Sequence, residues 1–414
     1  MTSKHRPLPH TQLDGIKTFR PYVYRCAKEE AKARAARGEF GPTGSIDDSP
    51  WIKEVLRQAQ LTFLSDAGLL RFGSPDQFFD GDVIRRDLLD ARGASVLMAI
   101  LTTVNYEFHS LVNFELSGSK TFRFADLLVE ELAQTSSNVK AEYVHLPFNS
   151  CCFVIESRVA IEAFHQFLTR DSDAAQAVTE EMYATPLTVF VHEIEPRDAT
   201  LGHPGLLFLA FHGDGKYQWG MAKRQVLLNP TWDVERALHT DWDKVHEEAG
   251  IDAAGIGLSF SHAGHEAHGI DDQSFYEDGL FFFRLLINMI LYVTSSDPDL
   301  LPREVGGGDA VSLARMSSKE RRTLRRETDR MAGLSVIETG SRLTALIVDP
   351  RAVEDVPRAS SVRSGRYTVR FKVRGGFRPR RVGPGRKEVK IVWVREHWKG
   401  PEMAELVNRH YEVR

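Results

Sequence analysis

The hydrophobic pattern of this chain changes near Tyr143, and that change limits the folds that the chain can adopt. Before this point apolar residues recur every three or four positions. After it, short apolar or alternating runs are bounded by Pro, Gly, Asp and Asn. The first pattern lines one face of a helix, and the second is typical of strands. The sequence therefore predicts an α+β fold: a helical N-terminal part, a central mixed α/β body with antiparallel strands, and a small basic C-terminal β element.

Helix signals are clearest in the N-terminal part. Residues 22–37 are rich in Ala, Lys, Glu and Arg and are followed by Gly38, which is a typical helix stop. Ser49 and Pro50 then open a second helix, because proline is favoured at the first helical position. Two further helices are expected at 88–101 and 124–132.

Strand signals dominate the central body. Strands are expected at 151–155, 187–192, 206–212 and 217–228. The GDG sequence at 213–215 is a hairpin turn signal between the last two. A charged helix is expected at 233–249. The longest apolar stretch, 280–293, is shorter than the about 20 residues of a membrane span, so 278–293 is interpreted as a buried helix.

Four regions follow from these patterns. A glycine-containing linker at 303–309, an Arg-rich helix at 317–331 and a strand at 343–348 are expected between the body and the C-terminal end. The regions are a mainly helical 1–140, an α+β body 141–302, a segment of linker, helix and strand 303–350, and a basic β element 351–414.

Composition indicates a globular protein of a reducing compartment. Apolar residues make up 42% of the chain and charged residues 27%, which is ordinary for such proteins. Cys26, Cys151 and Cys152 offer no disulfide framework, because adjacent cysteines rarely pair with each other. The N-terminal residues contain no apolar signal core. We therefore expect a cytoplasmic protein without a membrane partner.

The residue types that carry catalysis give little support for an enzyme. His262, His265 and His268 have a spacing that would present three imidazoles to a metal, so a metal-dependent hydrolase is one alternative. No HExxH pattern is present, and the glycines around them favour a solvated or partner-contacting loop at 255–269. Cys151 lies in an expected strand, where a buried thiol is favoured over a nucleophile. We predict no catalytic residues, no metal site and no cofactor.

Charge is divided unevenly along the chain. Residues 351–414 contain 17 Lys and Arg against 7 Asp and Glu, whereas the residues before them contain 36 against 50. A fold does not require such segregation, so the asymmetry indicates a partner for the basic end.

Two strands, 367–373 and 388–394, are expected in the basic end, joined by a loop rich in Gly, Pro and Arg. In the second strand, alternation places Val389, Ile391 and Trp393 on the face opposite Lys390. An apolar face would then pack down while a cationic face looks outward. The predicted binding residues are Arg374, Phe377, Arg378, Arg380, Arg381, Arg386, Lys387, Lys390, Trp393 and Trp398.

Several partners suit such a surface. RNA, an acidic protein and the acidic body of this chain would each be attracted to it, and Phe377 and Trp398 would add stacking on RNA bases. A charged face that contacts only water is the remaining interpretation. That interpretation also applies to the Arg-rich helix at 317–331.

The order of motifs in the basic end resembles that of a large type V-A anti-CRISPR family. The motifs are RGGF at 374–377, GPGR at 383–386, VWV at 392–394 and HWK at 397–399. Gly376 and Phe377 stand where family members carry His and Trp. Weaker similarity is present upstream, in LP at 146–147 and SDPD at 296–299, so the resemblance extends over roughly 90–400.

This resemblance implies a non-enzymatic inhibitor encoded by a phage or another mobile element. Its relatives are understood to lower production of the type V effector nuclease. The implied partners are therefore that effector or its nascent chain, and RNA or the ribosome through the basic end. An RNA-binding protein without a role in defence is the other alternative beside the hydrolase.

Overall fold

The structure of the chain is a computed structural model. It describes residues 12–39, 49–67, 79–80, 83–84, 89, 91–169, 179–194, 204–213, 218–240, 272–303, 335–341, 370–373, 375–395, 397–399 and 406–407. The loop at 255–269 with its three histidines, the Arg-rich helix at 317–331 and the strand at 343–348 lie outside these residues.

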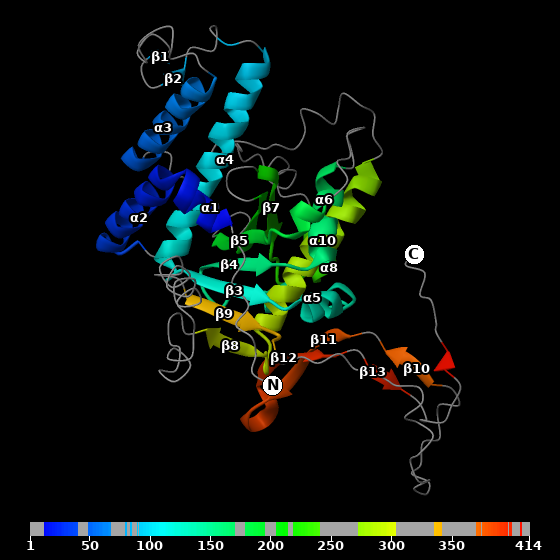
Figure 1. Ribbon diagram of the computed structural model, residues 1–414. Helices are drawn as coiled ribbons and strands as arrows, with labels where there is room; N and C mark the ends of the chain where they lie inside the picture. Colours follow the sequence, from blue (N-terminus) through cyan, green and yellow to red (C-terminus); the bar gives the residue numbers. More distant parts are fainter. Residues whose placement is uncertain are drawn as a thin grey trace, which may run out of the picture.

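A seven-stranded sheet forms the centre of the molecule (Figure 1). Its strands are β3 (Lys120–Phe124), β4 (Ser150–Ile155), β5 (Leu187–Ile194), β6 (Gly205–Gly213), β7 (Gln218–Leu227), β8 (Leu300–Arg303) and β9 (Ser335–Thr339). They lie in the order β7-β6-β5-β4-β3-β9-β8. β3 runs parallel to β4 and β9, and the other neighbours are antiparallel. The predicted α+β class is confirmed.

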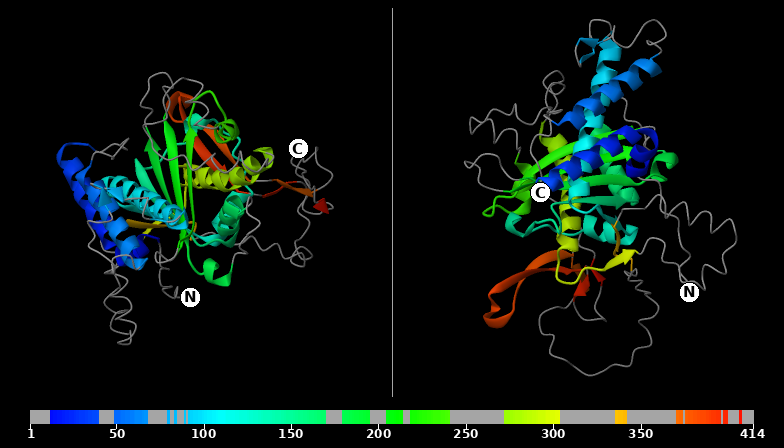
Figure 2. Two further views of the ribbon diagram at one scale, coloured as in Figure 1. Left: turned by 90° about the horizontal axis from the view of Figure 1, so that it is seen from above. Right: turned by 90° about the vertical axis from the view of Figure 1, so that its left-hand side faces the viewer.

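Helices cover both faces of this sheet (Figure 2). They are α1 (Gln12–Phe19), α2 (Pro21–Ala36), α3 (Pro50–Asp66), α4 (Ala91–Leu116), α5 (Asp126–Ala133), α6 (Arg158–Thr169), α7 (Glu180–Tyr183), α8 (Val234–His239) and α10 (Asp272–Val293). Residues of α5, α6, α8 and α10 form one hydrophobic cluster with the sheet, and residues of α1 to α4 form another. The sheet is therefore the middle of three layers.

Strand β4 shows how one sequence serves both clusters. Successive side chains of a strand point to opposite faces. Cys151, Phe153 and Ile155 accordingly belong to the cluster that contains α10, whereas Cys152 and Val154 belong to the cluster that contains α4. All of β4 is buried, and a strand covered on both faces needs the nearly continuous apolar run that SCCFVI supplies.

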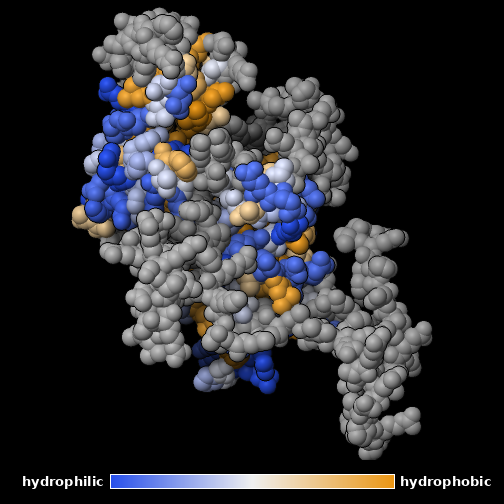
Figure 3. Space-filling view, in the orientation of Figure 1, coloured by the Kyte–Doolittle hydropathy of each residue, from blue (hydrophilic) through white to orange (hydrophobic). Residues whose placement is uncertain are grey.

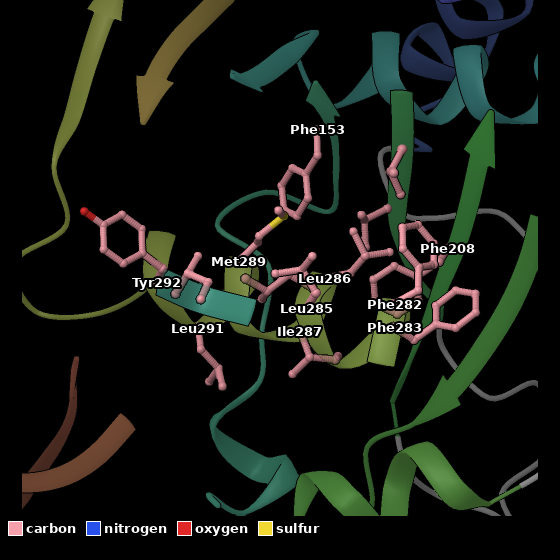
Figure 4. Packing of buried hydrophobic residues seen from close by; sticks show 14 of the residues in the cluster. Phe153, Phe208, Phe282, Phe283, Leu285, Leu286, Ile287, Met289, Leu291 and Tyr292 are labelled. Atoms are coloured by element: carbon pink, nitrogen blue, oxygen red, sulfur yellow. The ribbon is translucent and has the colours of Figure 1, made fainter. Parts of the chain in front are cut away.

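The expected buried helix is α10, which begins at Asp272 and ends at Val293. Figure 4 shows its apolar side chains beside Phe153 and Phe208 of the sheet. The rings of Phe208 and Phe283 meet edge to face with centroids 5.9 Å apart. No helix in the described part of the chain is long and apolar enough to cross a bilayer.

The polar interruption of α10, Asn288, connects this helix to α5. Its side-chain amide donates to the carbonyl oxygens of Leu132 and Thr135 at 2.9 and 3.0 Å. Its carbonyl oxygen accepts from the Ser137 hydroxyl at 2.9 Å. Carbonyl groups at the end of a helix lack intrahelical partners, so Asn288 satisfies the end of α5 inside the core.

The N-terminal helices differ from the sequence prediction in two places. α4 runs beyond the expected 88–101 to Leu116, because apolar residues such as Phe108 and Val112 continue at helical spacing. The helix expected at 124–132 begins only after Phe124, which is the last residue of β3 and pairs with Ile155. A two-residue pair, β1 (Phe79–Asp80) and β2 (Val83–Ile84), lies between α3 and α4. Of the helix expected at 233–249, the structure describes α8.

Strands β3 and β9 were not predicted, because polar residues interrupt their apolar ones. The structure pairs a charged residue of each strand across the sheet. Arg123 of β3 pairs with Glu156 at 2.5 Å and with Glu338 of β9 at 3.3 Å. The pairing joins positions that are 215 residues apart, so no local pattern marks it.

The basic end forms two small sheets in place of the expected pair of strands. β12 (Glu388–Val394) coincides with the second expected strand, but its partner is β11 (Gly376–Val382), within the expected loop. β10 (Arg370–Val373) pairs instead with β13 (His397–Lys399) and β14 (Leu406–Val407). The two expected strands therefore lie in different sheets, and the segment expected to be a loop between them contains a strand. The physical reason is that a short turn brings β11 beside β12 at little cost in chain entropy.

Candidate functional site

Strands β11 and β12 form a hairpin at 376–394, here termed the basic hairpin. Each strand has seven residues, and all of them pair across the hairpin. In the turn, Gly383, Gly385 and Arg386 have φ values of 78°, 68° and 54°. The Arg386 N–H donates to the Gly383 carbonyl oxygen at 3.0 Å. Glycine adopts positive φ without a steric cost, so the GPG sequence fixes this turn.

One end of the hairpin is packed against the body. Phe377 and Ile391 are only 4% and 7% exposed and belong to the cluster that contains α10. The Trp393 ring meets Tyr292 of α10 edge to face with centroids 5.0 Å apart. Its indole N–H donates to the Thr135 hydroxyl at 3.4 Å. These contacts fix the base of the hairpin to the end of α10.

Backbone hydrogen bonds strengthen the same attachment. The Ser136 N–H donates to the Gly375 carbonyl oxygen at 3.1 Å. The backbone N–H and the hydroxyl of Ser296 both donate to the Ile391 carbonyl oxygen, at 2.9 and 3.0 Å. The body thus holds the hairpin at the residue just before β11 and at Ile391 within β12.

An ion pair completes the attachment just after β12. Arg395 Nε donates to both carboxylate oxygens of Glu131 on α5, at 2.7 and 2.8 Å, and its Nη2 also contacts that carboxylate. One cation of the basic end is therefore neutralised by the body, as the intramolecular interpretation of the charge asymmetry expects.

Six other cations of the basic hairpin remain exposed: Arg378, Arg380, Arg381, Arg386, Lys387 and Lys390. Within the described part of the chain none of them forms an ion pair. The hairpin contains one acidic residue, Glu388, so its net charge is +5. Figure 3 shows strongly hydrophilic atoms at the lower end of the molecule, beside paler and apolar ones.

The pairing register divides these cations between two faces. Arg380 lies directly opposite Lys390, and Arg378 lies on the same face opposite Val392. This face, termed the cationic face, is opposite the one from which Phe377 and Ile391 enter the core. The hairpin therefore has an apolar face at its base and a cationic face turned outward, as the sequence alternation predicts for β12.

The remaining predicted binding residues have different positions. The rings of Phe377 and Trp393 pack inward, so they do not lie on the cationic face as stacking on bases would require. Arg374 lies outside the described residues, and only the backbone of Trp398 is described, in β13. Val389, expected on the packed face, is 41% exposed because it lies toward the turn, beyond the contact with the body.

Sequence reasoning did not single out Arg395 as an anchor. No local pattern marks it, because its partner Glu131 lies 264 positions away. The nearest signal is its place directly after the VWV sequence, whose Trp393 contacts the same region of the body.

Buried histidines form a separate polar cluster in the core. His165 Nε2 and His212 Nδ1 are 2.6 Å apart, and His212 Nε2 lies 3.0 Å from the Thr185 carbonyl oxygen. Burial, together with the neighbouring imidazole, lowers the pKa of His165 to about 4. Burial also lowers the pKa of His212. Both imidazoles are therefore neutral at neutral pH and act as a structural pair.

The other candidate reactive groups are also buried. Ser150 Oγ lies 2.7 Å from His192 Nδ1, and burial lowers the pKa of His192 to about 3. Burial raises the pKa of the Cys151 and Cys152 thiols, so neither is an activated nucleophile. Among the described residues, no group of three or more His, Cys, Asp and Glu side chains is placed to hold a metal. His262, His265 and His268 lie outside those residues.

Comparison with known proteins identifies the family. The model of the AcrVA2-like family, described as the anti-CRISPR type V subtype A2 family, matches residues 122–398, from β3 to β13. A solved structure titled "Crystal structure of AcrVA2" is similar at 12% identity and a TM-score of 0.39, over 93% of this chain and 96% of that one. No curated protein matches the chain. Because the family model matches more than half of the sequence, the chain belongs to the anti-CRISPR type V subtype A2 family.

Proposed function

We propose that this protein inhibits type V CRISPR defence by lowering production of the effector nuclease, through binding and without catalysis. The observation that carries the proposal is the family match over 122–398, which supports an anti-CRISPR function. A phage or another mobile element would encode the protein. Its protein partner, in the cytoplasm, would be the effector or the effector's nascent chain.

The chemistry of the described residues supports binding over catalysis. Of the described thiols and imidazoles, those of Cys151, Cys152, His165, His192 and His212 are buried in the core, whereas the imidazoles of His145, His239 and His397 are exposed. Burial raises the pKa of the two buried thiols and lowers the pKa of the three buried imidazoles, so these five groups are held in their neutral forms and are shielded from a substrate.

The charge distribution supports two kinds of contact. The 350 residues before the basic end have a net charge of −14, and the basic hairpin has a net charge of +5. We assign recognition of a protein partner to the acidic body. RNA or the ribosome would be contacted by the hairpin. The positive potential of the hairpin attracts a negatively charged partner before contact and repels positively charged ones.

The proposal is tested by separating effector amount from effector activity. The protein is co-expressed with a type V effector, and effector protein is measured by immunoblot. In parallel, purified protein is added to an effector already assembled with its guide RNA, and the rate of DNA cleavage is measured. We expect effector protein to fall in cells while the assembled effector cleaves at an undiminished rate. An unrelated nuclease from the same promoter serves as the control and should not fall.

The opposite result would overturn the proposed mode of action. Unchanged effector amount with inhibition of the assembled complex would indicate a direct blocker of the nuclease. RNA binding with no effect on either readout would indicate an RNA-binding protein without a role in defence. Stoichiometric Zn or Mn in the purified protein would instead support a hydrolase built on His262, His265 and His268.

A further inference from the structure

The cationic face contains a like-charge pair that no described ion pair relieves, although one carboxylate, that of Glu388, lies on the same face. Arg380 lies directly opposite Lys390, and Arg378 lies two positions along on the same face. Like charges directly opposite each other destabilise a pair of strands. No described carboxylate pairs with any of the three, whereas Arg395 at the base is paired with Glu131. An external anion would remove this repulsion.

The turn contains a second local cost. Arg386 has a φ of 54°, in the left-handed region that glycine normally occupies. A side chain is disfavoured there because its Cβ approaches a backbone carbonyl oxygen. Residues held in this region are concentrated at binding and catalytic sites. Here the strained residue is an arginine next to Lys387, at the most exposed end of the hairpin.

The hairpin presents these cations from a fixed base. Phe377, Ile391 and Trp393 hold one end in the core, while the turn projects away from the body (Figure 2). A binding surface whose backbone is already ordered loses less conformational entropy when a partner binds. The geometry is therefore that of a preformed surface.

The exposed chemistry suits phosphate groups better than an acidic protein. Protein interfaces are built around apolar or aromatic anchors that become buried. Among the described side chains of the hairpin, Val389 is the exposed large apolar one. Guanidinium groups bind phosphate oxygens in a bidentate manner. The Cα atoms of Arg378 and Arg380 are about 6.7 Å apart along the strand. This distance is comparable to the spacing of neighbouring phosphates in an extended nucleic-acid strand.

We propose that the cationic face and the turn of the basic hairpin bind the phosphate backbone of single-stranded RNA without reading its bases. The choice of RNA rests on the proposed function, because a protein that lowers effector production acts where the effector's message is translated. The hairpin's aromatic rings, Phe377 and Trp393, pack inward and leave no described aromatic surface for bases. Affinity would therefore come from charge and depend steeply on salt.

The test uses the full-length protein and a labelled oligouridine, with binding measured by fluorescence anisotropy over a series of salt concentrations. The cationic face and the turn supply five cations. Five phosphate contacts to a single strand predict a slope of about −3.5 when the logarithm of the association constant is plotted against the logarithm of the salt concentration. The hairpin variant R378Q/R380Q/K390Q leaves two of these contacts, so it should reduce the slope to about −1.4 and weaken binding about fiftyfold near 150 mM salt. The matched control K32Q/K53Q/R57Q removes three exposed cations from α2 and α3, and it should bind like the unaltered protein.

Three outcomes would overturn the inference. They are an unchanged slope in the hairpin variant, equal affinity for polyglutamate, and tighter binding to duplex DNA of the same length. A second variant, Lys390→Glu, keeps the hairpin sequence otherwise intact and should also weaken oligouridine binding, so loss of folding in the triple variant would not leave the inference untested.

The two proposals fail in distinguishable ways. If effector production falls and the hairpin variants bind oligouridine normally, the inference about the hairpin is wrong and the proposed function stands. If oligouridine binding follows the expected slopes and effector production is unaffected, the hairpin binds RNA and the proposed function is wrong.

Discussion

The central sheet and the basic hairpin are both β structures of one chain, but charged side chains are paired within the protein in the sheet and exposed without a described partner in the hairpin. In the sheet, β4 is buried along its whole length, and the arginine of neighbouring β3, Arg123, is paired with Glu156 and Glu338. In the hairpin, six cations are exposed and Arg380 faces Lys390. Packing therefore explains the residues of the sheet. In the hairpin, packing explains only the residues that contact the body, which are Phe377, Ile391 and Trp393.

This difference separates residues selected for folding from residues available for a partner. Removing a sheet residue should lower the stability of the whole molecule. Removing a hairpin residue should affect the attachment of the hairpin at its base and the binding of a polyanion at its tip. Four substitutions and one change of pH measure where this boundary lies.

The largest effect is expected from Phe153→Ala in β4. The Phe153 ring is fully buried and meets Phe124 and Phe122 edge to face, with centroids 5.0 and 5.9 Å apart. Truncation of a buried phenylalanine leaves a cavity and costs about 3–5 kcal/mol. Urea unfolding should show this loss, whereas Val96→Ala, at an exposed position on α4, should change stability by less than about 0.5 kcal/mol. A small effect at Phe153 would mean that the sheet is not the main source of stability.

Acid should destabilise the sheet through its buried histidine. Burial lowers the pKa of His192 to about 3, whereas the unfolded chain has an ordinary value near 6.5. The unfolded state therefore takes up a proton first. Stability is fully present above about pH 6.5 and falls as the pH is lowered toward about 3. Between pH 7 and pH 5 the loss from this one group is about 2 kcal/mol.

Replacing the histidine isolates that contribution. His192→Gln cannot titrate, so the difference in unfolding free energy between pH 7 and pH 5 should shrink by about 2 kcal/mol. His165 and His212 also have lowered pKa values and should maintain part of the acid sensitivity. The same pH dependence in the variant and the unaltered protein would contradict the buried, neutral state of His192.

The strands of the sheet differ in how far the sequence predicts them, and the cause is the source of their stability. β5 and β6 carry continuous apolar runs bounded by turn residues, so local pattern places them to within a few residues. β3 and β9 contain charged residues whose partners come from distant positions, such as Arg123 and Glu338. A pattern read along the chain cannot anticipate that pairing. The direction of β3, parallel to both neighbours, follows from the same distant contacts.

In the basic hairpin, the sequence predicts which side chains are exposed cations, but it does not predict which strands pair. The exposed cations and the inward alternation of Ile391 and Trp393 follow from the sequence. β11 does not, because GFRPRRV has the composition of a loop and becomes a strand through β12 and through the anchorage of Phe377. The anchoring roles of Arg395 and Ser296 also cannot be predicted from the neighbouring sequence, since each residue contacts a partner far along the chain.

The base of the hairpin should depend on Trp393. Trp393→Ala removes the contact with Tyr292 and the hydrogen bond to Thr135, and for a partly buried ring we expect a loss of about 2 kcal/mol. Hydrogen exchange should become faster in 376–394 while β4 to β6 remain protected. Trp393→Phe preserves a ring for Tyr292 and should have an intermediate effect. Equal loss of protection in the sheet would show that hairpin and sheet unfold as one unit.

The smallest effect on stability should have the opposite sign. Lys390→Glu replaces a like-charge pair with an opposite-charge pair across from Arg380, and such cross-strand pairs contribute about 0.2–1 kcal/mol. Hydrogen exchange in β12 should therefore become slower, although the same substitution is expected to weaken oligouridine binding. Glu388→Gln is the matched control, because it removes a charge from the same strand without creating an attractive pair. Faster exchange in Lys390→Glu would mean that the Arg380–Lys390 repulsion is already relieved within the protein, and the cationic tip would then resemble the sheet, whose charges are satisfied internally.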